Sequence, residues 1–69
     1  MSIDLAPVPN RLLTVHETAQ QLSLSTRTIW KLVATGDFPQ PLRIGGARRW
    51  RESDLTRYVE RLTAARDHR

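Results

Sequence analysis

Residues 24–34 constrain the fold more than any other stretch, because they predict a short helix with two unlike faces. Ile29, Leu32 and Val33 follow the i, i+3, i+4 spacing of a buried stripe. A helix lying in a DNA major groove needs a buried side and a side rich in donors and positive charge. The second side here holds no acid and four such residues: Thr26, Arg27, Trp30 and Lys31.

A shorter helix is predicted just before this one, at about residues 15–22. Thr14 followed by Glu17 has the spacing of a capping box, which satisfies two amide groups at a helix start. The helix carries its own apolar stripe, and His16 is expected to be an exposed residue of the first turn. These features predict a separate short helix that comes before the helix at residues 24–34.

The connection between the two helices is very short. Ser25 is a good N-terminal cap for the second helix, and we expect Leu24 to pack inward and fix the angle between the helices. Gly36 ends the second helix at about Thr35, because glycine adopts the left-handed cap conformation at low cost. Two short helices joined in this way predict a helix-turn-helix.

A basic β-hairpin is predicted next. Residues 42–44 alternate apolar and charged side chains, as in a half-buried strand, and Gly45-Gly46 suits a tight turn. Residues 48–51 form the return strand, with Trp50 turned inward, while Phe38 before the hairpin closes the core. The hairpin carries four arginines and no acid: Arg43, Arg48, Arg49 and Arg51.

A last helix is predicted from Asp54 to about Ala65. Ser53 is its expected cap, and its apolar residues follow the clearest helical period in the chain: Leu55, Tyr58, Val59 and Leu62. Residues 1–10 are expected to form a flexible arm and residues 66–69 a frayed tail, around one domain at residues 11–65. The fold class is therefore mostly α with a two-stranded hairpin, a winged helix-turn-helix.

Charge and composition favour an anionic partner. Seven basic and two acidic residues lie between Arg11 and Arg51, a net charge of +5 in a chain of net charge +4. No cysteine, metal-ligand cluster, catalytic set or phosphate-cradling loop is present, so we expect no metal, no cofactor and no enzymatic activity. We also expect no transmembrane helix and no signal peptide, which is compatible with a cytoplasmic protein.

The chemistry of the two basic elements predicts contacts with double-stranded DNA. Arg27 can take guanine O6 and N7 together, while threonine hydroxyls can reach phosphates or base edges. A glycine-tipped loop with arginines beside it can approach the backbone or a narrow minor groove. Trp30 has two interpretations: contact with DNA, or packing under the hairpin as an extension of the core. The predicted major-groove residues are Thr26, Arg27, Thr28, Trp30 and Lys31, and the predicted hairpin contacts are Arg43, Gly45, Gly46, Arg48, Arg49 and Arg51.

The chain resembles a known family in four segments: LLTVHETAQQL, LSTRTIWKL, GDFP and RIGGARRWRESDL. They are similar to the MerR-like helix-turn-helix domain of phage and plasmid excisionases and AlpA-type regulators, over about residues 12–62. One departure is Ser23, since this turn position is often glycine in the family, and serine there costs about 1 kcal/mol. The resemblance implies a winged-helix DNA binder with the residue 26–31 face in the major groove and the residue 45–49 loop against the minor groove or backbone.

The resemblance also implies partners and two competing functions. An excisionase binds repeated sites, bends DNA, often cooperatively, and directs an integrase toward excision; a small AlpA-type regulator would act at a promoter instead. We expect a monomer in solution that assembles head to tail on DNA, associated with the nucleoid of a bacterial or phage-infected cell. No membrane or small-molecule ligand is expected. A third hypothesis is a protein-interaction module with an acidic partner.

Overall fold

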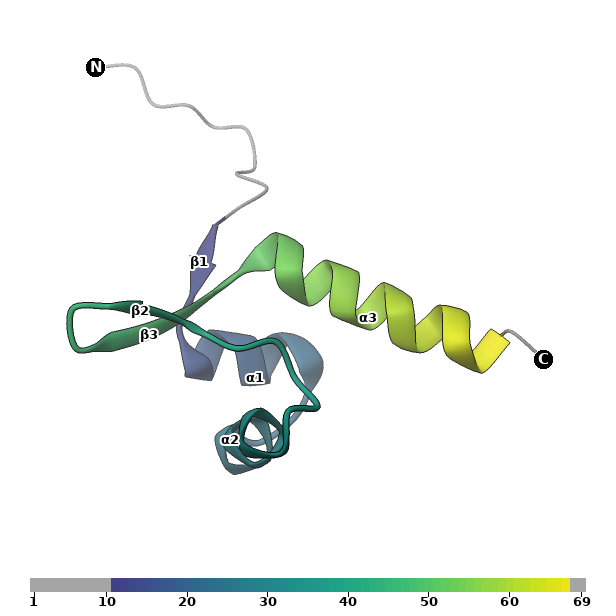
Figure 1. The fold of residues 1–69 in the computed structure, drawn as a ribbon, viewed down its shortest axis with the longest axis horizontal. Coiled ribbons are helices and arrows are strands. Elements are labelled where there is room, and N and C mark those ends of the chain that lie inside the picture. The colour runs from purple at the N-terminus through teal and green to yellow at the C-terminus, as the bar shows by residue number, and fades with distance from the viewer. Residues whose placement is uncertain (1–10, 68–69) are drawn as a thin grey trace, which may run out of the picture.

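The computed structural model describes residues 11–67 and shows three helices around a small sheet (Figure 1). It confirms the winged helix-turn-helix and adds one strand that was not predicted. The predicted arm, residues 1–10, and residues 68–69 lie outside the described part of the chain. In chain order the elements are β1 Leu12–Leu13, α1 Val15–Leu22, α2 Thr26–Thr35, β2 Leu42–Ile44, β3 Ala47–Arg51 and α3 Glu52–Asp67.

The sheet is antiparallel with the order β1-β3-β2, so the return strand of the hairpin lies in the centre. Leu13 pairs with Trp50, and the backbone N–H of Glu52 donates to the carbonyl of Arg11 at 2.8 Å. The N-terminal end of β1 is thereby fixed beside the start of α3. In the hairpin turn, Gly45 has φ +60°, as the first central residue of a II′ turn requires.

Both helices of the helix-turn-helix begin at their predicted caps. The Thr14 hydroxyl accepts the N–H of Glu17 at 3.1 Å, and the Glu17 carboxylate accepts the N–H of Thr14 at 2.9 Å, which completes the capping box. The Ser25 hydroxyl accepts the N–H of Thr28 at 3.1 Å at the start of α2. The local sequence therefore defines where each helix starts.

The turn between α1 and α2 is closed by backbone hydrogen bonds. Leu24 N–H donates to Ala19 at 2.8 Å and Ser23 N–H donates to Gln20 at 3.2 Å, the two bonds of a Schellman motif. Leu24 itself is 39% exposed, so the prediction that it packs inward is wrong. Its backbone sets the turn, because the hydrogen bonds of the motif need no side chain.

The core lies where α1, α2 and the first turn of α3 meet β1 and β3. Trp50 is central: its side chain is buried and its indole N–H donates to the carbonyl of Pro39 at 2.8 Å. The ring of Phe38 lies edge-on to both Trp50 and Tyr58, as the prediction that it closes the core requires. The buried apolar residues are Leu13, Ala19, Ile29, Phe38, Trp50 and Leu55.

Helix α3 differs from its prediction at both ends. It follows β3 without a loop and begins at Glu52, so Ser53 lies in its first turn and is not the cap. The main-chain N–H of Glu52 donates to the carbonyl of Arg11, which satisfies one amide group at that end of the helix. At the other end the helix continues through Asp67, beyond its predicted end at about Ala65. No helix in residues 11–67 has both the length and the apolar character needed to cross a membrane.

Only the first two of the four apolar residues that predicted α3 pack in the core. Leu55 is buried and Tyr58 is half-buried, but Val59 is 39% and Leu62 is 54% exposed. The helix extends away from the other elements, so its later turns pass beyond them (Figure 1). Periodicity in the sequence identified the helix correctly, although it could not show how far the neighbouring elements cover it.

Candidate nucleic-acid interface

Helix α2 presents a cationic face to solvent. Arg27 and Lys31 lie one turn apart and both are exposed, as predicted. Thr26 and Trp30 are half-buried along the edge of this face. Thr28 is also half-buried, and its hydroxyl accepts a hydrogen bond from the Ser25 hydroxyl at 2.9 Å, which uses it in the helix cap. The freely exposed predicted residues of α2 are therefore its two cations.

The hairpin has two faces that differ in their surroundings. Arg43 and Arg48 are directly opposite in the β2–β3 register, so their side chains share one face. Because side chains alternate along a strand, Arg48 and Trp50 also share that face, whereas Arg49 and Arg51 point to the other. The sequence prediction grouped all four arginines, and the strand register separates them into two pairs.

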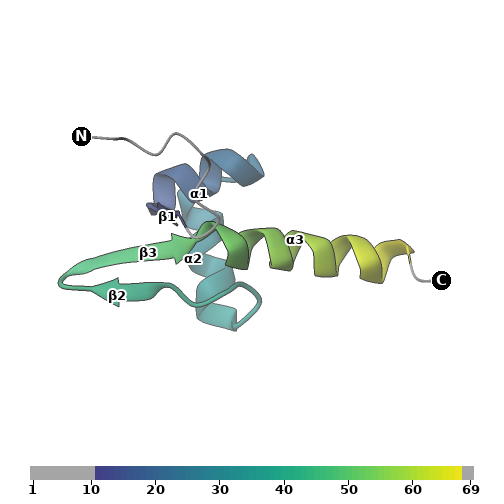
Figure 2. The same ribbon diagram turned by 90° about the horizontal axis from the view of Figure 1, so that it is seen from above.

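Trp30 joins the hairpin to α2. The Arg48 guanidinium carbon lies 5.5 Å from the centre of the Trp30 ring, a cation–π contact. The Trp30 and Trp50 rings lie 5.4 Å apart at 51°. Arg48 is thereby beside the helix that carries Arg27 and Lys31. Figure 2 shows β2 and β3 projecting past one side of α2, while α3 extends in the opposite direction.

The other two arginines have contacts within the protein. Arg51 forms an ion pair with Asp54 through Nε and Nη2, at 3.1 and 3.2 Å. Arg49 is half-buried and donates from Nη1 to the carbonyl of Arg48 at 2.8 Å. The pKa of Glu17 is lowered chiefly by the hydrogen bond from the Thr14 backbone, and the positive charges of Arg11 and Arg49 add to that effect. The predicted DNA contacts of Arg49 and Arg51 remain predictions, although both side chains also have partners within the protein.

The α2-side surface is defined as the four cationic residues Arg27, Lys31, Arg43 and Arg48. Among the side chains that the structure describes, the ion pairs join Arg11 to Glu17 and Arg51 to Asp54, and neither involves this surface. Like charges directly opposite on neighbouring strands, such as Arg43 and Arg48, destabilise a sheet. An anion that binds both would relieve this repulsion.

The apolar side chains of β2 are exposed, although their alternation predicted a half-buried strand. Leu42 is 41% and Ile44 is 49% exposed, so residues 42–44 do not form a half-buried strand. Trp50 and Leu13 occupy the core face of the sheet, and β2 lies beyond them as an outer strand of the projecting hairpin. Alternation predicts the strand correctly, but the face that carries Leu42 and Ile44 is the one opposite to Trp50.

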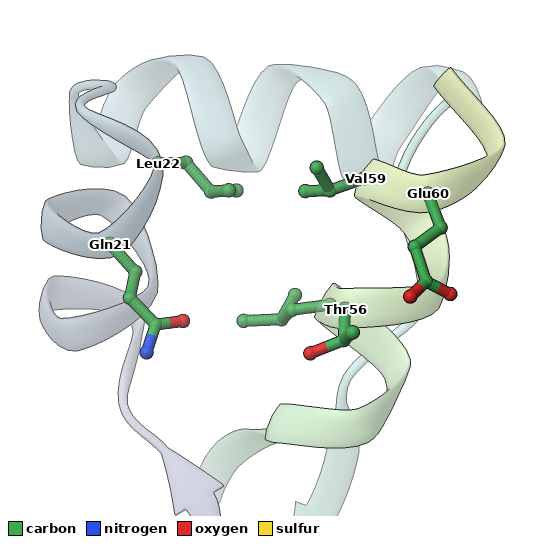
Figure 3. Close-up of a pocket in the computed structure, with 6 residues that line it drawn as sticks. Gln21, Leu22, Thr56, Val59 and Glu60 are labelled. Atoms are coloured by element: carbon green, nitrogen blue, oxygen red, sulfur yellow. The ribbon is translucent and has the colours of Figure 1, made fainter. Parts of the chain in front are cut away.

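A shallow groove of about 340 Å³ lies between α1 and α3, away from the predicted site residues. Leu22 of α1 and Val59 of α3 point toward each other across it, with Gln21, Thr56 and Glu60 at its margins (Figure 3). Glu60 is the one ionisable residue that lines the groove. The groove therefore contributes no positive charge to the predicted DNA-binding site.

Sequence reasoning missed the contact that joins the two basic elements. The signal was present as the spacing Arg48-x-Trp50, because residues two apart on a strand share a face. Once Trp50 was predicted to point inward, Arg48 could have been assigned to the same side. One of the two interpretations of Trp30, packing under the hairpin, is confirmed, because its ring lies 5.4 Å from that of Trp50.

The fold and the α2-side surface define a winged helix-turn-helix, a class of domain that binds DNA and is not generally enzymatic. The chain belongs to the helix-turn-helix domain family, whose profile matches residues 12–63. It is 43% identical over 58 residues to a probable excisionase of Saccharopolyspora erythraea. These findings confirm the predicted resemblance. The matched region covers 83% of this chain but 58% of that protein, and no solved structure matches the chain.

Proposed function

We propose that this chain is a sequence-specific DNA-binding excisionase that directs an integrase toward excision of a phage or mobile element. Helix α2 enters the major groove with Arg27 and Lys31, and the hairpin binds the adjacent minor groove or backbone through Arg43 and Arg48. The chain performs no strand chemistry of its own, and several copies bend the DNA while bound head to tail.

The observation that carries this proposal is the contact of Arg48 with Trp30, because it puts the hairpin and α2 on one side of the domain. A winged helix needs both elements on the same side to reach neighbouring grooves of one duplex. The probable excisionase among its relatives favours a recombination role over a promoter role. Exposed, unpaired cations fit phosphates, since phosphate contacts supply most of the affinity.

The binding mode can be tested with a labelled duplex from the attachment region and a random duplex, each titrated over a range of salt. Arg27→Ala should reduce discrimination between the two by about 1–3 kcal/mol. Arg48→Gln should weaken binding to both duplexes and reduce the log–log salt slope by about 0.9. Arg57→Gln, an equal charge loss on α3, is the matched control and should leave the slope unchanged.

The excision role needs a separate assay. A plasmid that carries the integrated element and the integrase gene from the same element should yield excised circles only when this chain is also expressed. Footprinting on the same DNA should show an array of direct repeats. Specific binding at a promoter, without any effect on excision, would replace the excisionase proposal with a transcriptional regulator of the same family.

A further inference from the structure

We propose that Trp30 is a positioning residue: it holds the Arg48 guanidinium against α2, so that the hairpin and the recognition helix meet DNA as one preformed surface. This inference rests on the proposed DNA binding and deepens it. The sequence prediction included Trp30 among the direct contacts in the major groove. The contacts around its ring assign it a different role.

Trp50 provides a fixed support for the Trp30 ring. It is 1% exposed, its indole N–H is bonded to Pro39, and Phe38 packs against it edge-on. Trp30 leans on this anchored ring at 5.4 Å. A half-buried indole supported in this way is a rigid platform, because the neighbouring tryptophan restricts its rotation.

Arg48 needs such a platform. It is exposed, it has Arg43 directly opposite on β2, and no carboxylate among the described residues pairs with it. Repulsion from Arg43 and the rotamer entropy of a long side chain would both favour many orientations away from the surface. The negative face of the indole ring attracts the guanidinium and selects one orientation.

The position of Trp30 on α2 gives this contact its functional meaning. Arg27 is one turn before Trp30, so these two residues are neighbours on the surface of α2, and the Arg48 guanidinium over the ring is held against the helix that also carries Lys31. The Arg48 guanidinium is then in place beside α2 before DNA arrives. A group that is ordered in the free protein loses less entropy on binding, and it therefore adds more affinity.

The test is a double-mutant cycle on duplex affinity. Trp30→Leu keeps an apolar side chain against Trp50 but removes the aromatic face, Trp30→Phe keeps a face, and Arg48→Gln removes the charge. We expect Trp30→Leu to weaken binding about two- to fivefold, the range that an exposed cation–π contact supports. Arg48→Gln should cost less affinity when it is combined with Trp30→Leu than in the parent, and Trp30→Phe should recover most of the loss.

Two further measurements keep this test decisive. Circular dichroism melting checks that each variant is folded. If Trp30→Leu does not fold, Arg48→Lys is used instead, because lysine keeps the positive charge at this exposed position but stacks less well on an aromatic ring. This variant should bind DNA more weakly than the parent, with an unchanged salt slope. In the free protein, NMR should show the Arg48 side-chain protons shifted by the Trp30 ring.

The outcomes separate this inference from the proposed function. A parent protein that binds duplex DNA, combined with additive effects of the two substitutions, would overturn the positioning role and leave DNA binding intact. An Arg48→Lys variant equal to the parent in affinity would also overturn it. A folded parent without affinity for any duplex would overturn the proposed function and this inference together.

Discussion

Two residues end the first two helices in the same way but with different chemistry. Ser23 after α1 has φ +57° and Gly36 after α2 has φ +80°, and each closes a Schellman motif. The left-handed region is unfavourable for a residue with a Cβ atom and neutral for glycine. The domain therefore contains one strained cap and one relaxed cap in nearly identical settings.

Replacement of Ser23 by glycine should stabilise the domain. We expect Ser23→Gly to raise the free energy of unfolding by about 0.5–1 kcal/mol, after allowance for the greater entropy of the unfolded chain. Urea denaturation provides the measurement. The matched control is Gly36→Ser, where an added Cβ meets no atom within 4 Å; it should destabilise by about 1 kcal/mol, through backbone strain alone. A destabilised Ser23→Gly protein would contradict this account of the turn.

Thr18 is a second residue that is expected to lower the stability of the folded domain. It is fully buried in α1 and its hydroxyl has no hydrogen-bond partner in the described structure. Burial of an unpaired hydroxyl is unfavourable, and valine has nearly the same shape. Thr18→Val should therefore raise the free energy of unfolding by about 1 kcal/mol, measured by thermal and urea denaturation. A loss of stability would show that the hydroxyl is bonded in solution.

At the scale of elements, the start of α1 depends on the ionised form of Glu17. Its pKa is lowered in the folded protein, mainly because its carboxylate accepts the Thr14 N–H. A lowered folded-state pKa means that the stabilisation is present above the unfolded pKa and is lost as pH falls through the folded value. Stability should therefore decrease as pH falls below the ordinary carboxyl range.

Glu17→Gln isolates this contribution, because glutamine can still accept the Thr14 N–H but does not titrate. We expect a smaller decrease of stability with acidification in the variant than in the parent, measured as the free energy of unfolding against pH. Identical pH profiles for the two proteins would contradict the assignment of the acid sensitivity to this cap.

The junction of β3 and α3 is joined by the Arg51–Asp54 ion pair. The two side chains are 46% and 22% exposed, so solvent weakens their interaction. A double-mutant cycle with Arg51→Gln and Asp54→Asn should give a coupling of at most about 1 kcal/mol in the free energy of unfolding. A much larger coupling would mean that the junction is held by charge and not by core packing around Leu55.

The elements were predictable to the extent that their signals are local. The capping box at Thr14 and Glu17, the Ser25 cap and Gly36 fixed α1 and α2, because each acts within one turn. Strand β1 has two residues, too few to show alternation, and it exists only because Trp50 and the start of α3 are nearby. Ser53 lies inside the first turn because the helix already starts at Glu52, whose backbone N–H donates to the carbonyl of Arg11, a residue distant in sequence.

At the scale of the whole molecule, the candidate site could be predicted in part. The cationic side of α2 follows from helical spacing, so Arg27 and Lys31 were assigned correctly to an exposed face. The division of the hairpin arginines depends on which face of β3 meets α2, and this is a tertiary property. Only the register and the Trp30 contact distinguish Arg43 and Arg48 from Arg49 and Arg51.

The proposed function requires α2 and one face of the hairpin to act as a single DNA-binding surface. The most direct measurement is an NMR titration of the labelled protein with a duplex from the attachment region. We expect the side-chain signals of Arg27, Lys31, Arg43 and Arg48 to change together, while those of Arg57 and Arg61 on α3 do not. Changes confined to α3, or to α2 without the hairpin, would contradict it.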